Sequence, residues 1–243
     1  RDPPSVKEAI EYLLQACEAL AEVHGLGIVH RDLKPANLFV TRGADGLPCV
    51  KLIDFGISRV EDGAASTDAL ALTGPDIVMG SPRYMPPEQM ESASLADARS
   101  DIWGLGAILY EMLVGEPPFD GESLCDIYAA TVLTPPKPPS SVNRRVPKAL
   151  DEVILTCLRV EPAERFADVA ALAAALARFG DGSAALRVEA IRRILEASRA
   201  RGHGEVDPPP RAAPSSSRIR RRSPSNLRRL ALGLGGASLV VLT

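Results

Sequence analysis

The chain has 243 residues, of which 46% are apolar, 24% charged and 4% aromatic, so length and composition predict one domain of ordinary size with appendages. The formal net charge of −3 argues against a protein dedicated to nucleic-acid binding. Four cysteines stand far apart without a Cys-x-x-Cys pair, and the chain has three histidines, which argues against a disulfide scaffold and a zinc module.

The charge is distributed unevenly along the chain. Residues 211–229 contain seven arginines and no acidic residue, whereas residues 230–243 contain no charged residue. Residues 1–210 must therefore carry a net charge of −10 to give the total of −3. No aromatic residue lies among these arginines to stack on a base, so we expect no nucleic-acid partner; salt-dependent oligonucleotide binding would test that alternative.

The first predicted element is an amphipathic helix that ends at Gly25. Ser5 and Glu8 have the S-x-x-E spacing of a capping box, in which the two side chains bond each other's backbone N–H groups. Apolar residues follow at helical spacing, namely Val6, Ile10, Leu13, Leu14, Cys17, Leu20 and Ala21.

Three short extended runs follow this helix, at residues 28–29, 37–40 and 50–53, and an Asp-Gly turn signal at 45–46 lies between the last two. These runs predict small strands around a loop. Residues 57–83 are rich in small and polar residues without a sustained period, which predicts a long surface segment of the kind that is often functional.

Three further helices are predicted in the globular part. Between residues 101 and 114 the apolar positions spread around most of the helix circumference, which is typical of a helix in the middle of a core. Amphipathic and alanine-rich patterns at 148–158 and 167–179 predict the other two. Trp103 and Tyr84 are expected to pack in the core rather than to contact a substrate.

The main candidate for chemistry is the sequence His-Arg-Asp-Leu-Lys-Pro-Ala-Asn at 30–37, followed by Asp-Phe-Gly at 54–56. Together these motifs resemble the catalytic and metal-binding loops of eukaryotic-type protein kinases. The chemistry agrees with the resemblance, because phosphoryl transfer needs a hydroxyl aimed at the γ-phosphate and countercharge for the spreading negative charge.

The resemblance implies one role for each residue of these motifs. Asp32 would accept the proton of the substrate hydroxyl, and Lys34 would pair with the transferring phosphate of ATP. Asn37 and Asp54 would hold the Mg²⁺ ions that bridge the ATP phosphates. A lysine two residues after the base is the pattern of serine/threonine-specific kinases, so the implied partners are proteins with Ser or Thr acceptors. Arg31 resembles the arginine on which a phosphorylated activation loop docks.

The resemblance continues through residues 80–88, which look like the end of an activation segment, with a proline in place of the alanine of the Ala-Pro-Glu motif. Asp101 then corresponds to the aspartate that braces the catalytic loop, and Arg165 to the arginine that pairs with the motif's glutamate, here Glu88. The match covers residues 5–180, and its ordered spacing outweighs the ordinary-loop interpretation of each short motif.

The same resemblance suggests regulatory residues between the two loops. Thr67 and Thr73 are the expected autophosphorylation sites, since a phosphate there can reach Arg31 and order the loop. Ser81 matches a hydroxyl residue near the catalytic Asp and Lys, and we expect it to support substrate positioning.

The expected fold is α+β and mainly α-helical: a protein kinase large lobe with a few short strands, over residues 1–182. Such kinases also have a small lobe with a Gly-rich loop over the phosphates, yet no G-x-G-x-x-G pattern occurs in the 243 residues. We therefore expect a fragment that is inactive by itself and whose partner is the missing small lobe. The alternative is a catalytically silent kinase-like module that recruits partners, which the complete set of catalytic-loop residues disfavours.

The C-terminal region predicts a membrane attachment. Residues 183–201 have an apolar stripe that predicts an additional helix, and residues 202–229 form a Pro-, Ser- and Arg-rich juxtamembrane linker. The 14 uncharged residues at 230–243 are fewer than the roughly 20 that span a bilayer, and we expect them to begin a transmembrane helix. The preceding arginines indicate a cytoplasmic lobe anchored to the cell inner membrane, as in bacterial receptor-like kinases. A disordered basic tail with an apolar end is the alternative.

Overall fold

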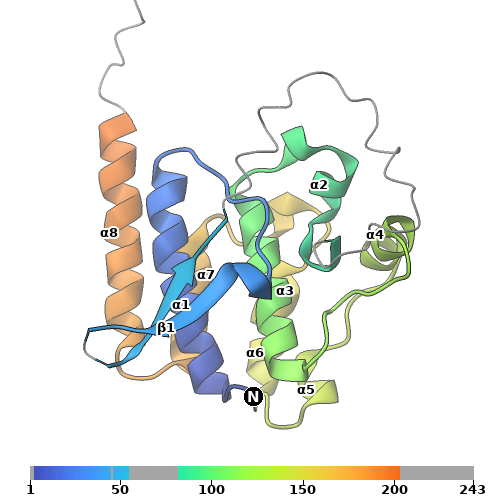
Figure 1. The fold of residues 1–243 in the computed structure, drawn as a ribbon, viewed down its shortest axis with the longest axis horizontal. Coiled ribbons are helices and arrows are strands. Elements are labelled where there is room, and N and C mark those ends of the chain that lie inside the picture. The colour runs from blue at the N-terminus through green and yellow to red at the C-terminus, as the bar shows by residue number, and fades with distance from the viewer. Residues whose placement is uncertain (1–2, 45, 55–81, 203–243) are drawn as a thin grey trace, which may run out of the picture. The chain divides into compact units, whose positions relative to one another are not determined.

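The structure of the chain is a computed structural model that describes residues 3–44, 46–54 and 82–202. All of these residues belong to the first of two contact units, residues 1–205. The elements, shown in Figure 1, are α1 (Val6–Gly25), β1 (Leu38–Arg42), β2 (Pro48–Leu52), α2 (Pro87–Glu91), α3 (Ala98–Val114), α4 (Leu124–Leu133), α5 (Pro139–Val142), α6 (Lys148–Cys157), α7 (Val169–Leu176) and α8 (Ala184–Gly202).

Helix α1 begins at the predicted capping box. The Ser5 hydroxyl accepts a hydrogen bond from the Glu8 backbone N–H, and a Glu8 carboxylate oxygen accepts one from the Ser5 N–H at 2.8 Å. These bonds satisfy donors that a helix N-terminus otherwise leaves without partners. The inner face of the helix is completely buried at the spacing expected for one stripe: Ala9, Ile10, Leu13, Leu14, Ala16, Cys17, Leu20 and Ala21.

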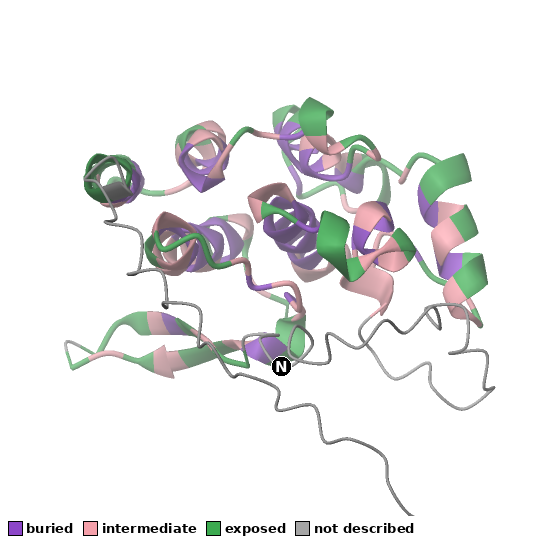
Figure 2. Cartoon of the chain, turned by 90° about the horizontal axis from the view of Figure 1, so that it is seen from above, coloured by how far each residue is buried: buried purple, intermediate pink, exposed green. Residues whose placement is uncertain are grey.

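Helix α3 forms the centre of the core, as its apolar pattern predicts. Asp97 caps its N-terminus, and its buried residues lie on all sides of the helix. Figure 2 shows the buried faces of the helices turned toward one another around it. Trp103 is fully buried and stacks on Phe119 with a ring-centroid distance of 5.5 Å. The expectation that Trp103 is a packing residue is therefore confirmed.

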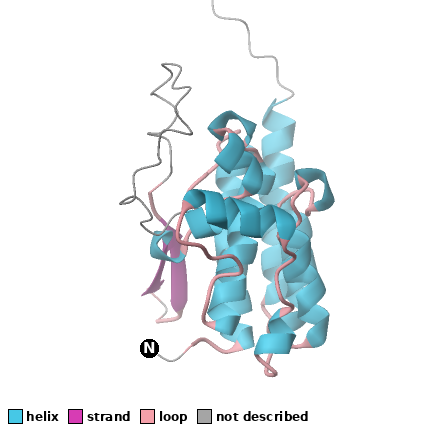
Figure 3. Cartoon of the chain, turned by 90° about the vertical axis from the view of Figure 1, so that its right-hand side faces the viewer, coloured by secondary structure: helices cyan, strands magenta, loops and turns pink. Residues whose placement is uncertain are grey.

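Strands β1 and β2 form an antiparallel hairpin that lies on one side of the helical body (Figures 2 and 3). Leu38 pairs with Leu52, and buried Val50 joins the core. The Gln15 side chain of α1 accepts a hydrogen bond from the Val50 N–H at 2.8 Å and donates one to the Pro48 carbonyl at 3.1 Å. The Gln15 side chain thus provides hydrogen-bond partners for a backbone N–H and a backbone carbonyl at the free edge of β2, where another strand could otherwise pair.

The strand predicted at residues 28–29 is absent from the described part of the chain. The Ile28 N–H instead donates to the Val23 carbonyl at the end of α1, at 3.0 Å. The Ile28 backbone therefore bonds to the last turn of α1 and does not pair with a strand. The β propensity of residues 28–29 could not predict this bond, because propensity does not specify the partner.

The remaining predicted helices are present with small shifts at their ends. The pattern at 148–158 corresponds to α6, and the pattern at 167–179 corresponds to α7 followed by a 3₁₀ turn at Ala177–Phe179. The additional helix expected at 183–201 is α8. No helix in the described residues is long and apolar enough to cross a membrane. The predicted linker and membrane segment lie outside the described residues.

The four cysteines are free thiols in different environments. Cys17 and Cys157 are buried, Cys49 is partly buried and Cys125 is exposed. Burial raises the pKa of Cys17 to about 12 and also raises the pKa of Cys157, because desolvation disfavours a thiolate. These two cysteines act as small apolar residues of the core.

We expect Leu13→Ala to lower the free energy of unfolding by about 2–5 kcal/mol, because it leaves a cavity in the fully buried face of α1. The matched control is Leu186→Ala on α8, whose leucine is 74% exposed and whose removal should change stability by less than about 0.5 kcal/mol. Urea unfolding followed by circular dichroism measures both. Equal effects of the two substitutions would contradict the burial described here.

Candidate active site

The loop between α1 and β1 brings three predicted site residues together. The Lys34 ammonium lies 2.7 Å from Oδ2 of Asp32, and both side chains are only about a fifth exposed, at 24% and 19%. The buried Asn37 amide donates to the Asp32 backbone carbonyl at 2.8 Å and to Asp32 Oδ2 at 3.2 Å. One carboxylate oxygen therefore has two donors that fix its position, while about a fifth of the side chain remains exposed.

The hairpin brings Asp54 to the same place. Asn37 ends a 3₁₀ turn that leads directly into β1, and Asp54 follows β2 by two residues. The Ile53 N–H donates to the Asn37 carbonyl at 3.1 Å, which extends the β1–β2 pairing to the residue before Asp54. The exposed Asp54 is thus held next to Asn37 although 17 residues separate them.

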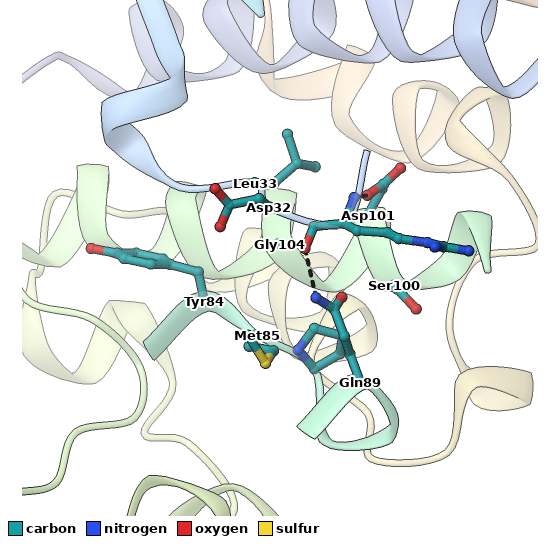
Figure 4. A pocket seen from close by; sticks show the side chains of 10 residues that line it. Asp32, Leu33, Tyr84, Met85, Gln89, Ser100, Asp101 and Gly104 are labelled. Atoms are coloured by element: carbon teal, nitrogen blue, oxygen red, sulfur yellow. Dashed lines mark hydrogen bonds between the residues drawn. The ribbon is translucent and has the colours of Figure 1, made fainter. Parts of the chain in front are cut away.

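Two non-glycine residues of the site have left-handed backbone conformations, Arg31 with φ 67° and Asp54 with φ 55°. Such conformations cost free energy and persist where surrounding contacts determine them. Both backbone polar groups of Arg31 are hydrogen-bonded. Its N–H donates to Asp101 Oδ1 at 2.9 Å, and its carbonyl accepts from the Gln89 amide at 2.6 Å, the dashed bond in Figure 4.

Asp101, in the first turn of α3, is the residue that organises this loop. Its carboxylate is 1% exposed and accepts from the His30 N–H at 2.9 Å, in addition to the Arg31 N–H. His24, in the last turn of α1, places its Nε2 2.7 Å from Asp101 Oδ2. The brace expected from the resemblance is therefore present and includes a histidine that the sequence analysis did not identify.

Glu88 and Arg165 form the second buried connection. The Arg165 guanidinium makes two parallel hydrogen bonds of 2.7 Å to the Glu88 carboxylate. It also donates to the backbone carbonyls of Arg99, Arg159 and Val160, and it lies over the Trp103 ring at 4.9 Å. This is the pair that the resemblance implied, and it joins α2 to the start of α3 and to the loop before α7.

Tyr84 has a polar contact that its expected packing role did not include. Its hydroxyl donates to the Glu111 carboxylate of α3 at 2.7 Å. Burial, and then this hydrogen bond to Glu111, raise the pKa of Tyr84 above its usual range. Tyr84 also lines a cavity of about 10 Å³ between the catalytic loop and α2, shown in Figure 4, where Oε1 of Gln89 has no partner. The cavity has about the volume that one water molecule needs.

His24, Gln89 and Tyr84 are the polar residues of the site that the sequence analysis missed or assigned differently. His24 and Gln89 bond to groups 77 and 58 residues away, so no local spacing could pair them. The sequence contained one indication of the role of His24, because it is a polar residue at the end of the apolar stripe of α1. Thr67, Thr73 and Ser81 lie outside the described residues, as do the last two residues of the Asp-Phe-Gly motif.

The fold and the loop geometry together define a protein-kinase-like large lobe. A solved structure agrees with this assignment: that of Rad53 1–466 in complex with AMP-PNP is similar to this chain with a TM-score of 0.51 and 26% sequence identity, over 68% of this chain and 39% of that chain. The fold class predicted from the sequence is thereby confirmed.

Sequence comparisons identify the family. The family model described as "Protein kinase domain" matches residues 3–176, and the chain therefore belongs to the protein kinase family. Serine/threonine-protein kinase Pkn1 of Myxococcus xanthus is 41% identical over 174 residues, which are 72% of this chain and 24% of that protein. Serine/threonine-protein kinase PknB of Mycobacterium tuberculosis is 39% identical over 180 residues, which are 74% of this chain and 27% of that protein. The chain thus spans about a quarter of the length of these curated relatives.

We expect Arg165→Lys to lower the free energy of unfolding by about 3 kcal/mol, because a lysine at this fully buried position keeps the charge but cannot reproduce the paired bonds to Glu88. The control is Arg193→Lys on α8, where arginine is 75% exposed and pairs with Glu189 one helical turn away. That change should be nearly neutral, as exposed ion pairs are. Urea midpoints at constant m-value measure both, and an Arg165→Lys protein as stable as the parent would refute the role of the buried pair.

Proposed function

We propose that the protein transfers the γ-phosphate of ATP to Ser and Thr hydroxyls of other proteins. The observation that supports this most directly is the position of Asp32 Oδ2, held by Lys34 at 2.7 Å and by Asn37 at 3.2 Å in an accessible loop beside Asp54. Pkn1 and PknB are named serine/threonine-protein kinases, and Rad53 was solved with AMP-PNP, an analogue of ATP. Lys34 at this position favours Ser and Thr over Tyr as acceptors.

In the proposed mechanism Asp32 orients the acceptor hydroxyl and accepts its proton as the oxygen attacks the γ-phosphorus, while the bond from the γ-phosphorus to the bridging oxygen breaks and ADP leaves. Lys34 is already 2.7 Å from this carboxylate, so its charge lies where the transferred phosphoryl oxygens would be. The ammonium thereby stabilises negative charge that develops in the transition state. Asn37 keeps the Asp32 carboxylate in place through its amide nitrogen.

The donor atoms next to Asp32 fit Mg²⁺. The hydrogen bonds of Asn37 to Asp32 use its amide nitrogen, so the amide oxygen is its atom for a cation, and the exposed Asp54 contributes a carboxylate. Mg²⁺ prefers such hard oxygen ligands and commonly takes one or two protein ligands together with substrate phosphates. When bound, Mg²⁺ supplies charge neutralisation for the ATP phosphates.

We propose further that the active enzyme includes a small lobe that covers the hairpin and the nucleotide. Supporting this, two apolar side chains on one face of the hairpin are exposed: Phe39 is 59% exposed, and Ile53, two residues after the partner of Phe39, is 40% exposed. Large exposed apolar groups that lie close together mark interaction surfaces. We expect residues 1–243 alone to show negligible ATP turnover.

The regulatory roles are also proposals. Thr67 and Thr73 would be phosphorylated and would then bind the region of Arg31, which would order the segment between the two loops. Ser81 would help to position the acceptor next to Asp32 and Lys34. We also propose that a helix beginning near Leu230 attaches the protein to the membrane. Seven arginines at 211–229 are followed directly by the uncharged residues 230–243, which is the pattern that supports this proposal.

We expect Asp32→Asn, made in a full-length product that includes a small lobe, to lower kcat on Ser/Thr peptides about 10²- to 10⁴-fold, because an amide cannot accept the hydroxyl proton. The matched control is Asp181→Asn, an exposed aspartate in the loop before α8, which should keep the parental rate. Phosphate incorporation from ATP and Mg²⁺ measures both. Unchanged turnover in the Asp32→Asn enzyme would disprove the assignment of the base, and transfer to Tyr alone would disprove the acceptor class.

We expect the full-length product to sediment with membranes and to resist carbonate extraction. Replacing Leu239 and Leu242 by Arg should release it, since these positions lie near the middle of a helix of roughly 20 residues that begins near Leu230, where each arginine opposes insertion by about 2.5–3.5 kcal/mol. The same positions changed to Val are the control and should leave the protein in the membrane fraction. A parent protein that stays in the supernatant would favour the basic-tail alternative.

A further inference from the structure

Helix α8 lies beyond the part of the chain that the family model matches, which ends at residue 176, yet it packs along the whole of α1 (Figure 1). Four of its side chains are buried in the common core: Ala184, Val188, Ile191 and Leu195. Near its N-terminus, Arg187 binds Glu11 at 2.7 Å and Glu18 at 2.8 Å, both on α1. The two helices are therefore joined by polar and apolar contacts at this end.

The other end of α8 touches the last residue of α1. Ser198 is 8% exposed and lies so close to Gly25 that a Cβ atom on Gly25 would contact the Ser198 hydroxyl and lie 2.7 Å from the Ser198 Cβ. Real Cβ atoms do not approach this closely, and the Ser198 Cβ cannot move without its helix. Glycine at position 25 thus sets how near α8 comes to the end of α1.

From Gly25 the contact continues to the catalytic loop through short bonds. The Gly27 N–H donates to the His24 carbonyl and the Leu26 N–H to the Val23 carbonyl, both at 3.0 Å, so the chain after Gly25 is tied to the last turn of α1. The His24 side chain in turn binds Asp101, which accepts from the N–H groups of His30 and Arg31. A displacement at Gly25 would therefore change both the His24–Asp101 bond and the start of the loop.

We propose that α8 is a positioning element for the catalytic loop and acts through the contact between Ser198 and Gly25. It holds the end of α1 so that His24 and the backbone of His30 and Arg31 converge on Asp101. Its consequence for turnover rests on the proposed kinase function, but its effect on the loop backbone does not. Ser198 is a positioning residue, since it acts through α1 and contacts no reacting group.

The experiment compares Gly25→Ala, Ser198→Gly and the double variant in the full-length product. Gly182→Ala is the matched control, because nothing lies within 4 Å of the Cβ it would add. Amide hydrogen exchange is followed in peptides covering residues 26–34 and, for comparison, in α6. We expect Gly25→Ala to speed exchange about tenfold in residues 26–34 but not in α6, and Ser198→Gly to restore slow exchange in the double variant.

Turnover gives a second readout. Gly25→Ala should lower kcat more than it raises the KM for ATP, because the displaced loop carries the base Asp32 whereas the small lobe is expected to supply most contacts to the nucleotide, and the double variant should recover. Parental exchange in Gly25→Ala, an equal increase in α6, or failure of Ser198→Gly to rescue would each overturn the proposal. If Gly25→Ala does not fold, Arg187→Gln can be tested instead, because it removes the ion pairs that join the other end of α8 to α1. We expect this variant to speed hydrogen exchange in the same peptides by a smaller factor. Unchanged exchange would overturn the proposal. A parent without turnover but with the expected exchange pattern would refute the proposed function only.

Discussion

A single buried carboxylate determines the geometry of the site. Asp101 accepts hydrogen bonds from the backbone N–H groups of His30 and Arg31 and contacts the His24 side chain, all within 2.9 Å. A buried carboxylate is stable only when such donors replace its hydration, and its place in the first turn of α3 is favourable for negative charge. The bond from the Arg31 N–H to Asp101 also stabilises the left-handed backbone of Arg31. Asp101 thereby determines the direction of the backbone at Asp32, the next residue.

The rigid centre of the lobe makes this arrangement possible. α3 is buried on all sides, and the Glu88–Arg165 pair fixes its N-terminus, since Glu88 also accepts from the Ser100 hydroxyl at 2.8 Å. Asp101 is the next residue after Ser100. The ion pair and the loop brace therefore meet at Ser100 and Asp101 in the first turn of α3, and α2 is thereby connected to the base of the catalytic loop.

Much of the fold and the convergence of residues in the loop before β1 could be predicted from the sequence, because both depend on local patterns. Helix periods, the capping box at Ser5 and the spacing of Asp32, Lys34 and Asn37 are visible within a few residues. The partners that hold these residues are not visible locally, since His24 and Asp101 are 77 residues apart. Helices α4 and α5 were not predicted either, because α5 has only four residues and the apolar residues of α4 are not confined to one face, although Ile127 and Thr131 are its only buried residues.

The pairing of the first and last described helices affects how the chain folds during synthesis. Arg187 and Glu11 are separated by 176 residues, so α1 leaves the ribosome long before the helix that covers its outer side. Contacts of such high sequence separation close slowly, and until then part of the apolar surface of α1 stays accessible to water and to chaperones. A nascent chain that already contains the complete catalytic loop would therefore still have an unfinished core, and the lobe would mature only after residue 202 has been added.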